Sequence, residues 1–260
     1  MNNFYKFDNL SKIDKYLIHN ITQKDNTRPY RSSMALHTGE DIQSILSNRW
    51  DMAERFIGSD EVDKFAFVVA TQTHSDHIRV VEEKRTQGWE SQDDAIEDCD
   101  ALITDLDEVV LTILTADCVP ILLYDPVHRV VASIHAGWRG TKAKIVQKTI
   151  SIMSRRFGSN PSDIVAGIAP SIGVCCYEVG YDVAEHFDKY PDAVVGRGDR
   201  YMLDLPLINK KQLIAAGLLE RSIEMSDTCT SCSVDRYFSY RKESGCSGRF
   251  MSMIAMKPNL

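Results

Sequence analysis

The chain carries seven short apolar runs that are rich in Val, Ile and Leu and are bounded by turn-forming residues. This pattern predicts strands. Two of the runs are separated by the sequence YDPVHR, in which Asp125 and Pro126 favour a hairpin turn. The predicted strands cover residues 65–71, 109–115, 120–124, 129–135, 163–168, 200–205 and 249–256.

Apolar positions spaced three and four residues apart predict helices between some of these strands. One helix is expected to begin near Gly39 with Thr38 as its N-cap, and a second follows Gly140. Two more are predicted over residues 181–187 and 207–216. Consecutive strands with interspersed helices indicate an α+β fold in which helices cover mixed sheets. Strict alternation of strand and helix is absent, and so are the glycine motifs of dinucleotide-binding and P-loop folds.

Nothing in the composition divides the chain, so we predict a single domain over residues 1–260. Residues 82–100 and 190–200 are polar and rich in turn-forming types, and we predict that they form exposed or mobile loops within that domain. A chain of this length can bury a sizeable core.

The overall charge indicates which kinds of partner the protein can bind. A formal net charge of −7 repels nucleic acids and anionic membranes, so we expect small-molecule partners and a monomer or homodimer. No apolar run is long enough to span a membrane, and the first residues lack an apolar signal core, which predicts a cytoplasmic protein. In such a reducing compartment, the seven cysteines are expected to be thiols, metal ligands or nucleophiles.

Three residues at the ends of predicted strands are candidates for a site. Cys118 and His135 flank one hairpin, and they can be interpreted as a nucleophile with its base, as two metal ligands, or as buried core residues. His74 follows another apolar run, whereas the nearby His77 is expected to be an ordinary surface histidine. The three together form a two-histidine, one-cysteine set, which is typical of catalytic zinc with an open fourth position and of blue copper. They are far apart in sequence, so only the fold can bring them together.

The sequence HAGWRG, directly after the last strand of the hairpin, predicts a possible anion site. Gly137 and Gly140 bracket Trp138 and Arg139, and a helix is expected to follow. Free backbone N–H groups at a helix start and the forked guanidinium both suit phosphate. The alternative is a tight turn in which Arg139 pairs with a surface carboxylate.

Further candidates lie in the loop APSIGVCCYEVG and beside Cys118. Glu178 and Asp117 are candidates for proton transfer, and Tyr177 could stack on a ring. Packing is the expected role of at least one of Cys175 and Cys176.

Two later motifs have less definite roles. Cys229 and Cys232 have the spacing of a redox motif or a zinc knuckle, but a knuckle needs a second pair and only Cys246 follows nearby. We therefore expect this pair to be structural or incidental. Arg241 and Arg249 lie in the basic stretch SYRKESGCSGRF and could reach an anionic group, although a solvated surface is the commoner outcome.

Six ordered strings, TQTH, TADCVP, HAGWRG, IGVCCYEVG, CTSC and SYRKESGCSGRF, resemble motifs of the laccase-domain family. Its members were long labelled multicopper polyphenol oxidases and have been reassigned as purine nucleoside phosphorylases with adenosine deaminase activity. The resemblance spans about residues 65 to 256. It implies a four-layer α/β/β/α sandwich and zinc bound by His74, Cys118 and His135.

The resemblance also implies a function. We predict a zinc-dependent purine nucleoside phosphorylase that uses phosphate, acts on adenosine and inosine, has methylthioadenosine as a further candidate substrate, and also deaminates adenosine. Copper is the alternative metal. The candidate catalytic residues are Asp117, Glu178 and Arg139, and the candidate substrate contacts are Gln72, Trp138, Arg139, Tyr177 and Arg241.

The chain departs from the family pattern at several positions. Ser75 stands where the family has glycine, Thr73 replaces a valine, and Lys242 replaces the second residue of an Arg-Arg pair. The family's N-terminal signature is not evident either, which bears on specificity if that segment covers the substrate.

Three other hypotheses stay open. A cysteine hydrolase would use Cys118 as nucleophile and His135 as base. A copper-dependent polyphenol oxidase ranks lower, because laccase chemistry needs several coppers and many histidines and the chain has only seven. A non-catalytic metal-binding module would explain the ligands but not the adjacent anion site.

Overall fold

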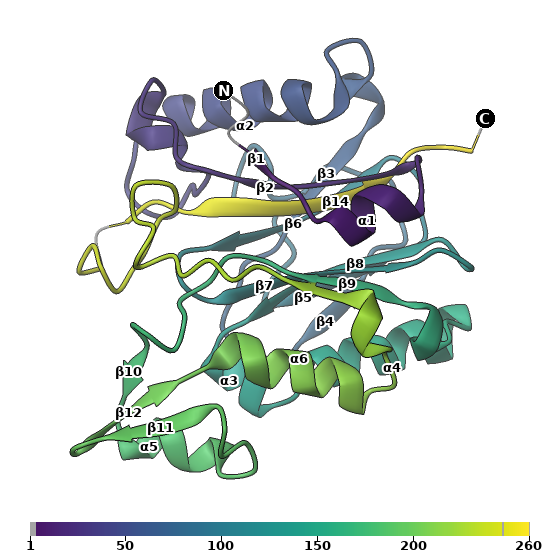
Figure 1. Ribbon diagram of the computed structural model, residues 1–260. Helices are drawn as coiled ribbons and strands as arrows, with labels where there is room; N and C mark the ends of the chain where they lie inside the picture. The colour runs from purple at the N-terminus through teal and green to yellow at the C-terminus, as the bar shows by residue number, and fades with distance from the viewer. Residues whose placement is uncertain (1–3, 246, 260) are drawn as a thin grey trace.

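Two β-sheets face each other at the centre of the protein and helices cover their outer faces, as the computed structural model in Figure 1 shows for residues 4–245 and 247–259. Helix α2 (Ile42–Ile57) lies over one sheet, and helices α4 (Ile145–Phe157) and α6 (Leu205–Ala215) lie over the other. The α+β fold with mixed sheets that the sequence predicts is confirmed.

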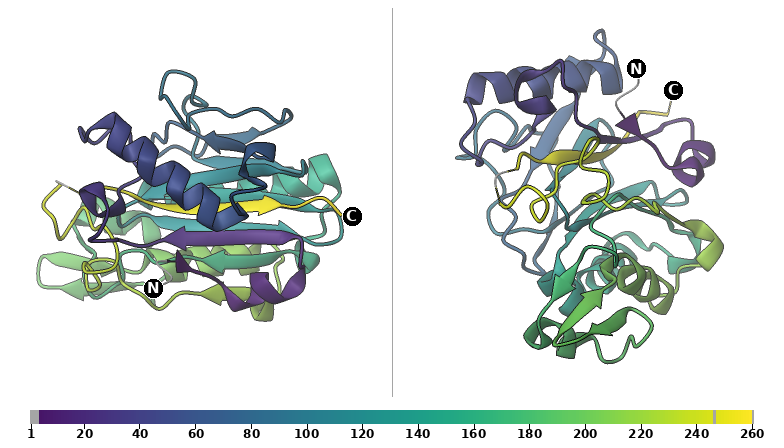
Figure 2. Two further views of the ribbon diagram at one scale, coloured as in Figure 1. Left: turned by 90° about the horizontal axis from the view of Figure 1, so that it is seen from above. Right: turned by 60° about the vertical axis from the view of Figure 1, so that its left-hand side comes forward.

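The five-stranded sheet joins the two ends of the chain. The strand order is β1-β2-β14-β6-β3, so the C-terminal strand lies between an N-terminal strand and a central one. Only β3 and β6 run parallel, and the other neighbours are antiparallel. Seen from above in Figure 2, α2 crosses the strands of this sheet. The strands are β1 (Phe4–Tyr5), β2 (Leu17–Thr22), β14 (Phe250–Met256), β6 (Val109–Thr115) and β3 (Ala66–Val69).

The six-stranded sheet contains the predicted hairpin. Asp125 turns the chain between β7 and β8, and its Oδ1 accepts a hydrogen bond from Val127 N at 2.8 Å. The register pairs Pro120 with His135, which places Cys118 beside His135 at the same end of the sheet. The order is β13 (Ile223–Met225), β9 (Val165–Ile168), β7 (Val119–Asp125), β8 (Val130–Ala136), β5 (Ala101–Thr104) and β4 (Ile78–Val80).

A third, small sheet overturns one loop prediction. Strand β11 (Val194–Arg197) lies within residues 190–200, which the sequence predicts to be a loop. It pairs with β12 (Arg200–Leu203), and β12 pairs with β10 (Glu178–Val179). The turn-forming residues of this polar segment connect two short paired strands, so the segment is not a loop over its whole length.

Two helix predictions need correction at their ends. The first helix is capped by Asp41, whose Oδ2 accepts a hydrogen bond from Ser44 N at 2.9 Å, and Thr38 lies outside it. The helix predicted after Gly140 is divided into α3 (Trp138–Lys142) and α4, because Lys144 adopts a left-handed conformation with φ of 62°. The remaining α-helices of the described residues are α1 (Asp8–Ile13) and α5 (Tyr181–Ala184), and a 3-10 turn over Glu185–Phe187 completes the helix predicted over residues 181–187.

Three buried apolar clusters fill the spaces between neighbouring layers. One lies between the six-stranded sheet and helices α4 and α6, and another lies between the five-stranded sheet and α2. The third cluster contains residues of both sheets, such as Leu111 and Leu122, and forms the interface between them. Burial of apolar surface on both faces of each sheet is the main source of stability for such a fold.

The segment of residues 82–100 is less exposed than the sequence predicts. Trp89 is fully buried and its ring stacks on Phe67 with centroids 4.3 Å apart. Asp100, at the end of the segment, is also fully buried. None of the described helices is both long and apolar enough for a transmembrane span.

Candidate metal centre

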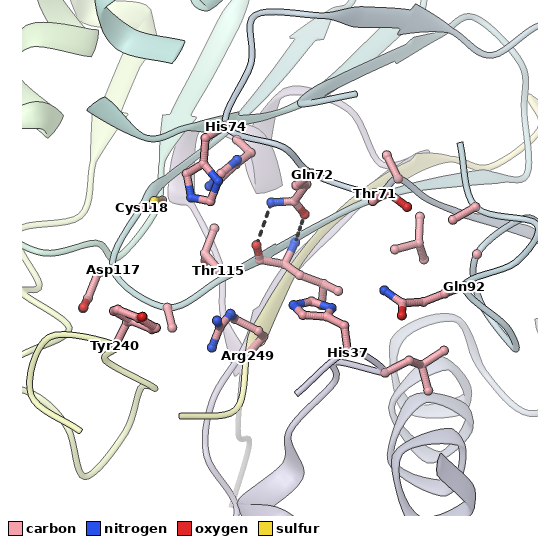
Figure 3. Close-up of a pocket in the computed structure, with 18 of the residues that line it drawn as sticks. His37, Thr71, Gln72, His74, Gln92, Thr115, Asp117, Cys118, Tyr240 and Arg249 are labelled. Atoms are coloured by element: carbon pink, nitrogen blue, oxygen red, sulfur yellow. Dashed lines mark hydrogen bonds between the residues drawn. The ribbon is translucent and has the colours of Figure 1, made fainter. Parts of the chain in front are cut away.

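A cavity of about 680 Å³ lies where β3, β6 and β8 end. Its size suits a small organic molecule, since ligand pockets commonly occupy about 300 to 1,000 Å³. Figure 3 shows His74, Cys118 and Asp117 on one side, and His37, Gln92 and Arg249 further along the wall.

His74, Cys118 and His135 converge at this cavity. One potential ligand atom from each lies within 4.8 Å of the others. The three side chains crowd over Gly137, where an added Cβ would lie 3.1 Å from His74 Cδ2 and 3.2 Å from Cys118 Sγ. The first glycine of HAGWRG, Gly137, therefore lets the three side chains approach one another, because any larger residue would contact them. Two imidazole nitrogens and a thiolate are a donor set that suits zinc, and the cavity leaves space on one side of it.

Asp100 supports both histidines from behind, and sequence reasoning missed it. Its Oδ1 lies 2.6 Å from His135 Nδ1 and accepts from His74 N at 3.1 Å. Its Oδ2 accepts from Ser75 N at 2.7 Å and from Thr73 N at 3.2 Å. Because Asp100 orients one ring and holds the loop of the other, it acts like the carboxylates that position metal-ligating histidines.

The two family departures near His74 belong to this network. Ser75 Oγ donates to Asp100 Oδ2 at 2.6 Å, and Thr73 Oγ1 donates to Asp98 Oδ1. His74 has a φ of 61°, a conformation that is uncommon for residues other than glycine. The hydrogen bonds to Asp100 fix the backbone in this conformation, as is common where strain accompanies function.

The charges of the three central residues depend on one another. Burial would raise the pKa of Cys118, but His135 and His74 beside it outweigh burial and lower the pKa to about 6. Burial would lower the pKa of His135, but Cys118 and Asp100 raise it to about 9. Burial alone would raise the pKa of Asp100, yet His135 and Ser75 hold it far below its usual range. Without metal, a thiolate next to an imidazolium is therefore favoured.

Asp117 lines the cavity next to Cys118, and both of its carboxylate oxygens accept hydrogen bonds. Oδ1 accepts from Thr230 Oγ1 and Oδ2 accepts from Arg241 N, each at 2.7 Å. Its φ of 92° places it in the left-handed region. Asp117 thus joins the end of β6 to two later segments of the chain.

Three predicted substrate contacts do line the cavity. Gln72 exchanges two hydrogen bonds of 2.8 Å with the backbone of Leu114, so it uses one donor and one acceptor to extend the strand end (Figure 3). The Arg241 guanidinium lies 5.4 Å from the centre of the Tyr177 ring, and both side chains contact the cavity. Burial, followed by the nearby Cys118 charge, raises the pKa of Tyr177 to about 12.

Three other candidates are not among the residues that line the cavity. Glu178 faces Arg197 and Arg200, with N–O distances of 3.7 and 3.6 Å. Arg139 is exposed and lies over the Trp138 ring at 4.5 Å, while Trp138 packs against the core beneath α4 and α6. Because α3 has only five residues, it offers little of the N-terminal field on which the anion prediction depends.

The cavity is also lined by Arg49, which sequence reasoning missed, and by Arg249, which it named only as a possible anion contact. Arg49 is 1% exposed and donates to the carbonyl oxygens of Met34, Gly88 and Trp89. Its position on the apolar face of α2 was the available signal, since an arginine there must find buried partners. Arg249 donates from Nη1 to Ser247 O at 2.6 Å and also lines the cavity, where a solvated surface was the commoner expectation.

Three other histidines are separate from the cavity, whereas His37 lines its wall without belonging to a potential metal group of the described residues. His77 is exposed and pairs with Asp98 at 2.8 Å, as a surface histidine is expected to do. His128 pairs with Asp125, and His186 stacks on Trp138.

Cys229 and Cys232 are not an isolated pair, so the expectation that only Cys246 could contribute to a second pair is wrong, whereas their structural or incidental role stays a prediction. They lie with Cys175 and Cys176 in a second group whose sulfur atoms are all within 4.8 Å of one another. The second pair comes from the loop after β9, which is distant in sequence and is brought close by the fold. Cys246 lies outside the described residues.

Comparisons with known proteins agree with the motifs. The family model described as multi-copper polyphenol oxidoreductase laccase matches residues 22–257. A protein named purine nucleoside phosphorylase YlmD, from Bacillus subtilis (strain 168), is 33% identical over 254 residues, covering 94% of this chain and 90% of the relative. A protein named adenosine deaminase RL5, from an unknown prokaryotic organism, is 36% identical over 228 residues, covering 85% of each chain.

A solved structure agrees over almost the whole length. The crystal structure of YlmD from Geobacillus stearothermophilus superimposes with a TM-score of 0.89 at 29% identity, covering 99% of this chain and 100% of that one. The sequence and structural matches extend across both sheets and every segment of the centre. The chain therefore belongs to the multi-copper polyphenol oxidoreductase laccase family.

Proposed function

We propose that this protein is a zinc-dependent purine nucleoside phosphorylase with adenosine deaminase activity. The observation that carries the proposal is the convergence of His74, Cys118 and His135 at the wall of a cavity of nucleoside size. The names of the relatives, one a purine nucleoside phosphorylase and one an adenosine deaminase, support this choice of reaction.

The three ligands would hold the metal in an orientation fixed by Asp100. In the metal-bound state, His135 Nδ1 would donate its proton to Asp100, and Nε2 would give up its proton and present a lone pair to the metal. The lowered pKa of Cys118 provides the thiolate that metal binding requires. When bound, zinc supplies Lewis-acid polarisation to a substrate or water oxygen.

The cavity residues would bind the nucleoside and phosphate. Tyr177 presents an aromatic surface for a purine, and the Arg241 guanidinium lies beside it. Arg241 and Arg249 are forked donors suited to a phosphate oxygen. Arg139 as the phosphate ligand stays a prediction, and its place outside the lining favours Arg241 and Arg249 for this role.

Asp117 is the better of the two predicted carboxylates for proton transfer. It lines the cavity next to Cys118, whereas Glu178 faces two arginines outside the lining. Its hydrogen bonds to Thr230 and Arg241 N hold the carboxylate in one orientation. We propose that Asp117 exchanges a proton with the substrate through one of these oxygens.

The test is product analysis with purified, zinc-loaded protein. Inosine with phosphate should yield hypoxanthine and ribose 1-phosphate, and adenosine should release ammonia. His74→Ala should abolish both reactions, and the matched variant His77→Ala should retain them because His77 is an exposed histidine paired with Asp98. Absence of ribose 1-phosphate, free base and ammonia from the wild-type reactions would refute the proposal.

A cysteine hydrolase is the second candidate, because the metal-free pair of Cys118 and His135 favours a thiolate and an imidazolium. The two proposals differ at His74, which a Cys–His dyad does not need. The dyad would be favoured if the protein hydrolyses an ester substrate, if His74→Ala keeps this activity, and if alkylation of Cys118 by iodoacetamide abolishes it.

The copper oxidase is less well supported. Among the described residues, His74 and His135 are the only histidines in a potential metal group. Laccase chemistry needs several coppers with imidazole ligands. The oxidase function would be supported if the copper-loaded protein oxidises a phenolic substrate and the zinc-loaded protein does not.

A further inference from the structure

The four cysteines on two loops behind the cavity form a compact cluster. Cys175 and Cys176 follow β9, and Cys229 and Cys232 follow β13. The sulfur of Cys232 lies 3.6 Å from that of Cys175 and 3.4 Å from that of Cys176. All four sulfurs lie within 4.8 Å of one another.

These separations match the edges of a tetrathiolate site. A zinc–sulfur bond of about 2.3 Å implies a sulfur–sulfur edge of about 3.8 Å in a regular tetrahedron. The sulfurs are well beyond the disulfide bond length of about 2.05 Å, and all four cysteines are free thiols. The spacing of Cys229 and Cys232 is also that of a zinc knuckle, whose missing second pair is Cys175 and Cys176.

The surrounding backbone is shaped for sulfur ligands. Gly173 N donates a hydrogen bond to Cys229 Sγ at 3.3 Å, which favours a thiolate there. A Cβ on Gly173 would lie 3.3 Å from Cys229 Cβ and 3.5 Å from Cys175 Sγ. Glycine at this position therefore lets the two loops approach each other around the sulfurs.

We propose that Cys175, Cys176, Cys229 and Cys232 form a second, structural zinc site. Four sulfur ligands leave no open position for substrate, which distinguishes the site from the two-histidine, one-cysteine centre. Tetrahedral sulfur ligation suits zinc, with iron as the principal competitor.

The site ties together the two loops that build one wall of the cavity. Thr230 N donates to Ser171 O at 3.0 Å, and Thr230 Oγ1 donates to Asp117. Ile172 N donates to Asp117 O at 2.8 Å. Since Ile172 and Tyr177 line the cavity, zinc at the four cysteines would hold this wall against Asp117.

Metal counting tests the proposal independently of enzyme activity. The full-length protein is saturated with zinc under reducing conditions, desalted and analysed by mass spectrometry of the metal. We expect two zinc ions per chain in the wild type and one in the Cys229→Ser/Cys232→Ser variant. Cys118→Ser should also retain one, and Cys99→Ser, at a buried cysteine outside both groups, should retain two.

A spectroscopic experiment covers the case in which the cysteine variant does not fold. X-ray absorption by the zinc-loaded His74→Ala/His135→Ala variant should show only sulfur neighbours, at about 2.3 Å. A zinc count that the Cys229→Ser/Cys232→Ser substitution does not lower, nitrogen or oxygen neighbours in this variant, or iron instead of zinc at the four cysteines would overturn the assignment.

Discussion

The two potential metal-ligand groups of this protein share Asp117 as a neighbour, yet they are built differently. Cys118 and His135 stand at the ends of β7 and β8 and His74 in the loop between β3 and β4, with a buried carboxylate behind them and a cavity in front. The four cysteines stand on loops, two of them exposed, without a carboxylate among the ligands. Mixed ligands with an open side suit catalysis, whereas four thiolates suit the joining of loops.

The site of His74, Cys118 and His135 is called the mixed site, because its ligands would be two histidines and one cysteine. The largest effect of a substitution is expected there. Cys118→Ser should lower kcat/KM for inosine phosphorolysis by at least ~1000-fold, because a metal supplies several kcal/mol of transition-state stabilisation. Steady-state kinetics with matched zinc loading measure it, and Cys99→Ser is the control substitution. Near-normal activity in Cys118→Ser would remove the mixed site from catalysis.

A histidine outside both groups shows what burial alone does to an imidazole, because it is buried like His135 but is not a potential metal ligand. His19 is 2% exposed and its Nε2 accepts from Phe7 N at 2.9 Å. Burial, followed by the charge of Lys6, lowers the pKa of His19 from 6.5 to about 4. The unfolded chain therefore binds the extra proton first, and stability should fall by about 3 kcal/mol as the pH drops from 6.5 to 4.

Denaturant unfolding at a series of pH values measures this loss. His19→Gln keeps an acceptor without a titrating ring, so its stability should change less over the same pH range. An identical pH slope in wild type and His19→Gln would contradict the prediction.

Asp100→Asn tests the support of the mixed site alone. Asparagine keeps the shape but loses the charge that fixes His135, so zinc affinity at this site should weaken about 10- to 100-fold. Competition with a coloured chelator can resolve the two sites, and affinity at the four cysteines should stay unchanged. An equal loss at both sites would indicate general destabilisation, which thermal unfolding would reveal.

The smallest expected effect on catalysis comes from the four cysteines. Cys229→Ser/Cys232→Ser should raise KM for inosine by less than about tenfold, or ~1.4 kcal/mol, because the wall carrying Tyr177 loosens. The kcat should change little and the unfolding temperature should fall. A fall in kcat comparable to that of Cys118→Ser would mean that the two groups act as one catalytic unit.

The sequence predicted the local features of the fold well. All seven predicted strands overlap observed strands, and the turn at Asp125 joins β7 and β8. Alternation of apolar residues and turn chemistry act over a few neighbours, so they can be read from the chain. The other seven strands of the described residues, including the buried β2 and β5, were not predicted. Further errors lie at ends, such as the cap at Asp41, and in polar segments, such as the one that holds the buried Trp89.

The sequence by itself also nominated the residues that meet at the mixed site, because each of His74, Cys118 and His135 stands at or near a strand end. Only the tertiary structure decided their partners. Asp100 looked like part of an exposed charged loop, and it is the buried acceptor for both histidine segments.

Tertiary structure likewise united Cys175 and Cys176 with Cys229 and Cys232, and it left Glu178 and Arg139 outside the cavity lining. The physical reason is range. Propensity and periodicity are set by neighbours in sequence, whereas a ligand set depends on strand order and register, which bring together side chains that are distant along the chain.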